Sequence, residues 1–405
     1  MMRKLWIVWL VLLGILSPVS GQEESQNWAD IIALDWDRAG NRLAIGYEGG
    51  AIKILDTQSG NSINIGQLAE TSVLSIDWHP MDDNLIAVGA ISIYYRIYDI
   101  TQNEIVGHAE VGSTSVSSVS WNVDGTLIAT AANWVRDIFA EPRVDIWDAT
   151  THELVTSFQH SGFITDVQWH PTDPFKLVST TDKGDIRFWD VNLSDEYRPA
   201  ISIDSGSGHA LWNHDGSQIA ISQGATGGCL VSVWDVDELE ETPSQQFEIK
   251  CYINLAWKND GTLAISEEST YHITDVEARE IFETGELTLP DGPEYVNALD
   301  WSVNGDLAVG GTDDTLVYFK PNTYYIVDEA SDLARFINMA NANTSMNIFD
   351  LRGDFELTEA LPQITGKITI IGDEAQLTTL RESGMLSVAD GGQLSFEIRE
   401  ITQGA

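Results

Sequence analysis

The chain is poor in cysteine, in proline and in positive charge. Its 405 residues include two cysteines, 11 prolines, and 21 lysines and arginines against 62 aspartates and glutamates, which gives a formal net charge of −41. So large a negative charge repels phosphate backbones and anionic headgroups, and it argues against binding to nucleic acid or to a membrane surface. Glycine and proline are too few for a collagen-like or low-complexity chain. With 43% hydrophobic residues, the chain can bury a sizeable core.

The chain also lacks the residue spacings that mark common active sites. It has no phosphate-binding P-loop, no Gly-x-Ser-x-Gly turn and no His-Glu-x-x-His pair. The glycine-rich run over residues 224–228 lies between two apolar segments, so it is interpreted as a tight turn. No segment has EF-hand spacing, and calcium at turn aspartates is kept only as an alternative. These aspartates are Asp182, Asp185, Asp313 and Asp314. We expect a non-catalytic protein without a cofactor.

The first 21 residues have the pattern of a secretion signal. Arg3 and Lys4 precede an apolar run over residues 5–16, and small residues follow at 19–21. This run is shorter than the roughly 20 residues that span a bilayer, and no second apolar span follows it. We predict that residues 1–21 are a cleaved signal peptide and that the mature chain is secreted or extracytoplasmic, without membrane insertion. An uncleaved signal anchor is the alternative.

Seven tryptophans recur at a nearly constant interval, with spacings of 42, 43, 48, 43, 45 and 44 residues. Each ends a short segment whose length and β-branched content favour a strand. Turn pairs such as Asp124-Gly125 and Asp260-Gly261 follow most of them and suit tight hairpins, because both residue types tolerate positive φ. The seven are Trp36, Trp78, Trp121, Trp169, Trp212, Trp257 and Trp301.

A second marker, usually ending in aspartate, keeps step with the first. Three copies are Trp-Asp pairs: Trp147-Asp148, Trp189-Asp190 and Trp234-Asp235. The period, the four strands expected in each unit and these pairs resemble the WD40 repeat family over residues 28–321. The resemblance implies an all-β fold, a seven-bladed β-propeller over residues 22–322. It also implies docking of a protein or peptide on the top face. The strand that closes the last blade is left open between residues 22–30 and residues 323–327.

The same resemblance makes a prediction about one buried network. In the family, a histidine before the Trp-Asp strand often joins a hydrogen-bonded network that includes an aspartate. His160 occupies that place, but Lys183 stands where the aspartate is expected. We expect the network to be incomplete.

The pattern changes after residue 321. An amphipathic helix is predicted over residues 332–341, followed by strands over 346–351, 367–371 and 393–398. The strands follow one another at the length of one coil of a β-solenoid. Residues 361–372 resemble the opening coils of right-handed parallel β-helices in secreted bacterial proteins. We predict a partial parallel β-helix-like domain over residues 323–405.

The two cysteines are expected to form a disulfide, because export places them where disulfides persist. If residues 230–235 and 246–252 pair as the third and fourth strands of the fifth unit, Cys229 lies opposite Cys251. Two buried thiols are the alternative.

The candidate binding site is a long connection in the third unit, between Thr130 and Val144. It carries Trp134, Arg136 and Phe139, which are residue types enriched in interface hot spots. Arg136 also suits a carboxylate partner. The alternative is that Trp134 and Phe139 pack on a neighbouring blade. We predict a secreted scaffold that docks a protein or peptide. A polysaccharide-binding or polysaccharide-processing protein and a truncated fragment of a larger surface protein are the alternatives.

Overall fold

The computed structural model describes most of the repeat region and part of the chain beyond residue 321. The described residues are 30–67, 71–135, 142–203, 208–225, 228–236, 243, 245–249, 254–276, 280–286, 288–289, 292–293, 295–312, 314–319, 323–327, 333, 337, 346–351, 361–365, 367–372, 387–388 and 393–398. Among these residues, no helix has the length and apolarity that a membrane crossing requires. The predicted signal peptide, residues 1–21, lies outside them.

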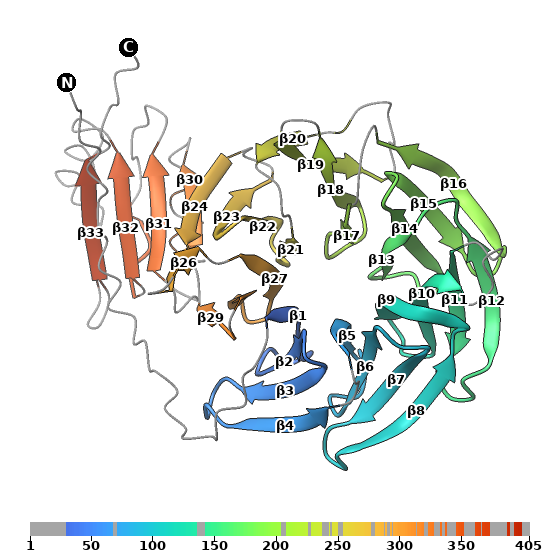
Figure 1. The fold of residues 1–405 in the computed structure, drawn as a ribbon. Helices are drawn as coiled ribbons and strands as arrows, with labels where there is room; N and C mark the ends of the chain where they lie inside the picture. The colour runs from blue at the N-terminus through green and yellow to red at the C-terminus, as the bar shows by residue number, and fades with distance from the viewer. Residues whose placement is uncertain are drawn as a thin grey trace.

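Seven antiparallel sheets stand around a common axis and form a β-propeller (Figure 1). Blades 1 and 2 consist of β1 (Ile31–Trp36), β2 (Arg42–Tyr47), β3 (Ala51–Asp56), β4 (Ser62–Gln67), β5 (Val73–Trp78), β6 (Leu85–Ala90), β7 (Tyr94–Asp99) and β8 (Glu104–Glu110). Blades 3 and 4 consist of β9 (Ser113–Trp121), β10 (Leu127–Val135), β11 (Arg143–Asp148), β12 (Leu154–Gln159), β13 (Ile164–Trp169), β14 (Lys176–Thr181), β15 (Asp185–Asp190) and β16 (Asp195–Ser202).

The remaining blades follow the same order from the axis outward. Blades 5 and 6 consist of β17 (Ala210–Trp212), β18 (Gln218–Ala225), β19 (Gly228–Asp235), β20 (Gln245–Ile249), β21 (Leu255–Trp257), β22 (Thr262–Glu267), β23 (Thr270–Asp275) and β24 (Glu280–Glu286). Blade 7 consists of β27 (Val296–Trp301), β28 (Leu307–Gly311) and β29 (Leu316–Phe319), and a short ladder of β25 (Thr288–Leu289) and β26 (Gly292–Pro293) precedes it. The prediction of a seven-bladed, all-β propeller is confirmed.

The described hydrophobic core of the ring is divided among the seven junctions between blades. Each cluster takes residues from two neighbouring sheets, for example Ile54 of blade 1 with Ile86 of blade 2. Six of the seven repeat tryptophans are buried, and Trp257 is partly buried. The repeat therefore places its large side chains where one blade covers the next, and the blades stabilise one another.

The turns after the inner strands differ from the prediction in one detail. In the turn of blade 3 the Gly125 N–H donates to Asn122 O, and Gly125 has φ of 72°. Asp124 is not among the residues with positive φ. In this turn only the glycine adopts the left-handed conformation, and the aspartate before it has a negative φ. Glycine takes this position because it has no Cβ to clash there.

Side-chain hydrogen bonds join blades 7 and 1 where the ring closes. The Trp36 N–H donates to Asp300 Oδ2 at 2.8 Å, and the Tyr47 hydroxyl donates to Asp314 Oδ1 at 2.6 Å. Residues 323–327, one of the two strands considered for closing the last blade, do not close it. They form β30 (Thr323–Val327), which pairs in parallel with a strand outside the ring. Most of the other candidate, residues 22–29, lies outside the described residues.

Beyond the ring, four strands form a parallel sheet in chain order (Figure 1). They are β30, β31 (Met346–Leu351), β32 (Lys367–Gly372) and β33 (Gln393–Ile398), and Ile364 bridges in parallel to Val388. The last three correspond to the predicted strands. Leu333 and Ile337 are helical and fully buried, in agreement with one apolar face of the predicted helix. The rest of residues 332–341 lies outside the described residues.

Candidate functional site

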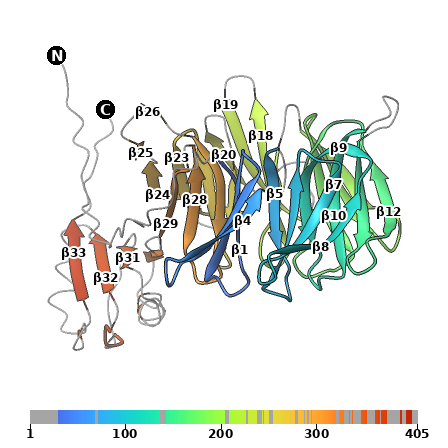
Figure 2. The same cartoon turned by 60° about the horizontal axis from the view of Figure 1, so that its bottom comes forward.

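The connections between second and third strands define one face of the ring, called the top face below. The inner strands begin at this face, since Ile31 at the start of β1 pairs with Tyr47 at the end of β2. Two hairpins are longer than the others there: β10 with β11, and β18 with β19, whose projection is visible in Figure 2.

The predicted binding residues lie on the first of these hairpins. Trp134 belongs to β10, where the backbone continues to pair with β9 as far as Val135 opposite Ser113. The Trp134 side chain, Arg136 and Phe139 lie outside the described part of the structure. The structure describes the two strand ends on either side of this connection, at Asn133 and Arg143, which are called its base below.

One side of that base is tied to the next blade by Asn133. Its side chain is fully buried, and its amide group pairs with a backbone N–H and a backbone carbonyl as another peptide group would. Its Nδ2 donates to Ile164 O at 2.7 Å and to Ser117 Oγ at 2.8 Å, while its Oδ1 accepts from the Ile164 N–H at 2.8 Å. These bonds join blade 3 to the inner strand of blade 4.

The other side of the base is held by a buried ion pair. Arg143 Nε donates to Asp145 Oδ1 at 2.8 Å, and its Nη2 donates to Val111 O at 2.8 Å. Asp145 is fully buried and also accepts from Ser157 Oγ at 2.6 Å. Burial raises the pKa of Asp145, although bonds from Ser157 and Arg143 oppose the shift. Sequence reasoning missed this pair, whose only signal is two charges alternating with apolar residues in a predicted core strand.

The incomplete network at His160 is confirmed. His160 Nε2 lies 2.6 Å from Ser179 Oγ, and Trp189 Nε1 donates to the same hydroxyl at 2.7 Å. His160 Nδ1 is buried without a partner among the described residues, and Lys183 Nζ donates instead to Ser161 O. Burial lowers the pKa of His160 to about 4, so the ring is neutral at physiological pH.

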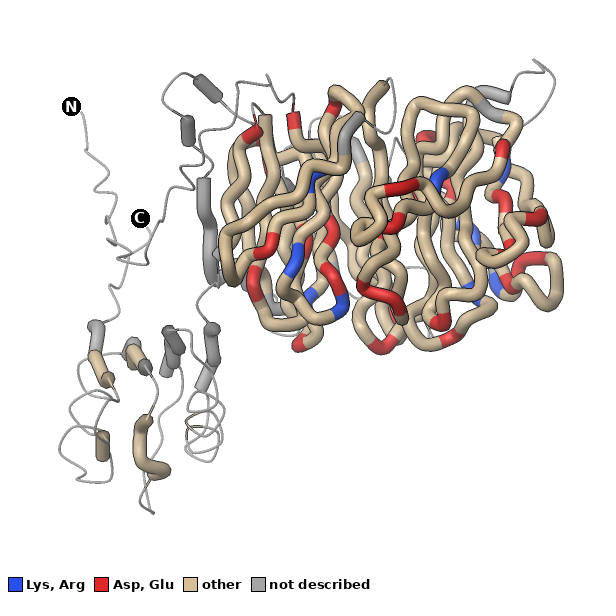
Figure 3. The backbone as a smooth tube through the Cα atoms, turned by 90° about the horizontal axis from the view of Figure 1, so that it is seen from below, with Lys and Arg blue, Asp and Glu red and all other residues tan. Residues whose placement is uncertain are grey.

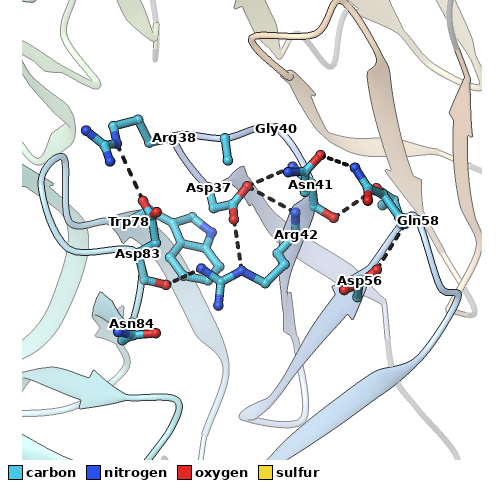
Figure 4. Close-up of polar contacts among 12 residues, drawn as sticks. Asp37, Arg38, Gly40, Asn41, Arg42, Asp56, Gln58, Trp78, Asp83 and Asn84 are labelled. Carbon is cyan, nitrogen blue, oxygen red and sulfur yellow. Dashed lines mark hydrogen bonds and ion pairs between the residues drawn. The ribbon is translucent and has the colours of Figure 1, made fainter.

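On the opposite face, two arginines lie at the junction of blades 1 and 2 (Figure 4). Arg42 Nε donates to Asp37 Oδ2 at 2.9 Å, and its guanidinium lies 5.0 Å from the centroid of the Trp78 ring. Arg42 Nη2 donates to Asp83 O at 2.5 Å. Arg38 Nε is 3.6 Å from Asp83 Oδ1 and is mostly exposed. Acidic residues are otherwise spread over the blades, with few lysines and arginines between them (Figure 3).

The axis of the ring holds a cavity of about 180 Å³ that all seven inner strands line. The residue three positions before each inner tryptophan faces it. In blades 2 to 6 this residue is polar, and in blades 7 and 1 it is alanine. The seven are Ser75, Ser118, Asp166, His209, Asn254, Ala298 and Ala33. This polar arc was missed at the sequence level, although aligning the repeats on tryptophan displays it.

Three aspartates lie one residue before an inner tryptophan and link consecutive blades. Asp300 Oδ2 accepts from the Trp36 N–H, Asp35 Oδ2 from the Trp78 N–H, and Asp77 Oδ2 from the Trp121 N–H. Burial raises the pKa of Asp77 and of Asp300 to about 7. Burial and then the neighbouring carboxylates raise the pKa of Asp35 well above its usual value.

Three of the four candidate calcium ligands have hydrogen-bond partners within the protein. Asp182 Oδ1 accepts from the Phe163 N–H at 2.8 Å, Asp185 Oδ2 pairs with Arg187 Nε at 2.8 Å, and Asp314 accepts from Tyr47. Asp313 lies outside the described residues. In the described part of the chain, no three histidine, cysteine, aspartate or glutamate side chains are placed to hold a metal ion.

The register expected around the cysteines is wrong by two residues. Cys229 is buried in β19, and its backbone partner in β20 is Ile249, not residue 251. The pairing is shifted by two residues, because Gln245 pairs with Val233 where the prediction placed it opposite residue 235. Cys251 lies outside the described residues, so the disulfide stays a prediction.

Comparison with known proteins agrees with the architecture. A family model described as "Anaphase-promoting complex subunit 4 WD40 domain" matches residues 3–80 and 65–124, and one described as "WD domain, G-beta repeat" matches residues 152–190. The chain therefore carries WD40 repeats on a seven-bladed propeller.

Three curated relatives resemble parts of the chain. The "APC/C activator protein CDH1" of Saccharomyces cerevisiae is 22% identical over 58% of this chain and 40% of its own length. The "WD repeat-containing protein slp1" of Schizosaccharomyces pombe is 25% identical over 56% and 44%. The "F-box-like/WD repeat-containing protein TBL1X" of Mus musculus is 28% identical over 33% and 28%. The matches span less than half of the length of each relative.

Proposed function

We propose that this propeller of WD40 repeats is a non-catalytic scaffold that docks a protein or peptide partner on its top face. The observation that carries the proposal is the anchored base of the β10–β11 hairpin. Asn133 fixes one strand to blade 4, and Arg143 fixes the other to the Val111 carbonyl. Such a base presents the intervening residues on a rigid element, as a binding site requires. A matching family model is described as a domain of a complex subunit, and one similar protein is named an activator protein, which supports a role in protein interactions.

We also propose a location for the protein and a fold for the residues beyond the ring. We propose that residues 1–21 direct export and are removed, and that the mature scaffold is extracytoplasmic. The parallel order of β30 to β33 supports the proposal that residues 323–405 begin a parallel β-helix. N-terminal sequencing of the secreted chain would test the cleavage, and a mature chain that retains residues 1–21 would contradict it.

The docking site is tested by a double substitution, Trp134→Ala with Arg136→Ala. The mature chain serves as bait, and captured proteins are quantified by mass spectrometry. We expect the double variant to lose the captured partner while its melting temperature stays within a few degrees of the parent, because few hot-spot residues carry most of the binding energy.

The matched control removes one cation and one large apolar side chain from the opposite face. Arg38 and Met81 are exposed there, at 60% for the arginine side chain and 63% for the methionine. Capture should survive Arg38→Ala with Met81→Ala. A large drop in melting temperature with capture intact would show that Trp134 packs on the blades. Equal loss of capture in both double variants would show non-specific adhesion.

A further inference from the structure

At one level the lining of the axial cavity is polar on the side of blades 2 to 6 and apolar on the side of blades 7 and 1, and this difference indicates what the cavity binds. Five consecutive blades place a polar side chain at one level, whereas blades 7 and 1 place Ala298 and Ala33 there. A structural role in the repeat would call for similar residues in all seven blades. The polar arc instead distinguishes one side of the channel from the other.

The centre of the arc is Asp166 of blade 4, which is 8% exposed. Its Oδ1 accepts from Ser118 Oγ at 2.9 Å and from the Val167 N–H at 2.8 Å. Its Oδ2 has a weaker contact, 3.5 Å to His209 Nδ1. A buried carboxylate needs hydrogen bonds or a positive charge to offset its lost hydration. Oδ1 thus accepts two short hydrogen bonds, whereas Oδ2 has one long contact, and Asp166 lines the cavity.

Asn254 also lines the cavity, and it donates its amide Nδ2 to Val296 O at 3.3 Å. Its other side-chain group is an oxygen, which can only accept a hydrogen bond. Nearly half of the His209 side chain, 47%, is exposed to solvent, so the cavity is open to small solutes. Burial lowers the pKa of His209, but the Asp166 carboxylate outweighs it and the net shift is upward.

The cavity lining excludes several classes of ligand. No lysine or arginine is among the described residues that line the cavity, and the Asp166 carboxylate is one of them. An anion would find no cation there to bind it. A metal ion lacks a set of three ligands in the described part of the chain. The volume of about 180 Å³ is below that of pockets for drug-sized ligands.

We propose that the axial cavity binds a primary ammonium group, with Asp166 as its counter-ion and Ser118, His209 and Asn254 as its polar surroundings. An ammonium group carries three donors, which match a carboxylate and amide oxygens. The group comes either from a free alkylamine or from a lysine side chain that a docked partner extends into the channel. The lysine source rests on the proposed docking function, and the amine source does not.

The test uses the mature chain and isothermal titration calorimetry at constant ionic strength. The probes are n-butylammonium chloride, 1-butanol as the uncharged control, and a pentapeptide with one lysine between glycines and serines, compared with its glutamine analogue. We expect the amine to bind and 1-butanol not to bind. Tighter binding of the lysine peptide than of its glutamine analogue would assign the source to a partner. Binding of the amine alone would assign it to a free solute.

Three variants locate the site. Asp166→Asn should weaken amine binding roughly tenfold, because it removes the counter-ion and keeps the shape. Asn254→Asp should strengthen binding, and it keeps the proposal testable if the first variant does not fold. Asp77→Asn is the matched control, since it removes a carboxylate elsewhere on the axis and should change binding less than twofold.

Four results would overturn the proposal. They are no heat from the amine, equal binding of 1-butanol, equal losses in Asp77→Asn and Asp166→Asn, and peptide binding that the three channel variants leave unchanged. The last result would place recognition on the face of the ring and would leave the docking function standing. Loss of partner capture in the Trp134 and Arg136 variant with amine binding intact would separate the two sites.

Discussion

Arg42 shows how single residues hold neighbouring blades together. The Asp37 side chain that it contacts is almost completely buried, and Oδ1 of that carboxylate accepts from the backbone N–H groups of Asn41 and Arg42. The guanidinium then continues to blade 2, where it contacts Trp78 and the Asp83 carbonyl. One side chain therefore neutralises a buried charge and joins two sheets.

Arg42→Ala should lower the free energy of unfolding by about 2–3 kcal/mol, because it leaves the Asp37 carboxylate buried without its cation. Arg38→Ala at the same junction should change it by less than about 0.5 kcal/mol, since that arginine is mostly exposed. Urea unfolding of both variants measures the difference. Equal losses would mean that Asp37 does not depend on Arg42.

The Cys229–Cys251 disulfide is a second expectation at this scale. No free cysteine is found in the part of the chain that the structure describes, and Cys229 lies in that part. The bond would close a loop of 22 residues and stabilise the fold by about 3 kcal/mol. Thiol titration of the denatured, unreduced mature chain should give no thiol, and a value of two per chain would show that the bond is absent.

Among the elements, the turns after the inner strands of blades 3 and 5 contact a histidine of the preceding blade. His79 of blade 2 lies edge-on to Trp121 of blade 3 at 4.5 Å between ring centroids, and a Cβ on Gly125 would overlap the histidine ring. His170 and Trp212 repeat this arrangement between blades 4 and 5, at 4.8 Å. The contact of each histidine with the next blade has no local signal in the sequence, since it joins two repeats.

Two glycines with the same backbone conformation allow this contact to be measured. Gly125 and Gly261 both have positive φ, but only Gly125 lies against a histidine, and nothing is within 4 Å of the Cβ position at Gly261. Gly261→Ala should cost about 1 kcal/mol from backbone strain alone. Gly125→Ala should cost at least about 2 kcal/mol, because His79 must move as well. Thermal unfolding tests this, and equal shifts in melting temperature would show that the histidine contact contributes nothing.

The elements were largely predictable and their register was not. Apolar spacing and glycine turns located the inner strands, because each repeat buries the same positions. The pairing of Cys229 with Ile249 depends on the length of the β19–β20 loop, which no periodicity fixes. The polar arc was hidden for another reason. Asp166 and Asn254 are different residue types, so no recurring residue marks the set, and only the structure shows that both line the same cavity.

For the whole molecule, the aspartates at the junctions of blades 7, 1, 2 and 3 make ring closure depend on pH. Asp77 and Asp300 have pKa values of about 7, far above that of an unfolded aspartate, so the folded ring holds protons that the unfolded chain releases. Stability from these groups is fully present below about pH 4 and is lost as the pH rises through 7. Turn aspartates act in the opposite sense: hydrogen bonds from Thr101, then from Gln102, lower the pKa of Asp99 to about 2.

The contribution of these aspartates to stability should therefore be greatest near pH 4 and should fall between about pH 4 and 7. The free energy of unfolding, measured with urea at fixed ionic strength, should fall from pH 5 to pH 8 by up to about 1.4 kcal/mol per pH unit for each protonated group. Asp77→Asn should make this slope shallower, because asparagine has no proton to lose. A slope unchanged in the variant would show that Asp77 is already ionised at pH 5.

Ring closure itself was beyond prediction from the repeats. Both candidate strands were argued from hydrophobic pattern, but blades 7 and 1 are joined by a hydrophobic cluster together with polar contacts that are specific to this chain. Asn304 donates from Nδ2 to the Ala39 and Gly40 carbonyls, a contact across 264 residues of sequence. Such a pair has no local signal in either segment.

The repeated tryptophans give the molecule an optical property. Each blade has one indole at the same place, at the end of its inner strand, but the neighbours differ: an arginine over Trp78, a histidine beside Trp121, a lysine over Trp301. Replacing one indole at a time with phenylalanine would subtract the emission of one blade from the total. Seven such difference spectra, followed during unfolding, would show whether the ring comes apart at once or one sector at a time.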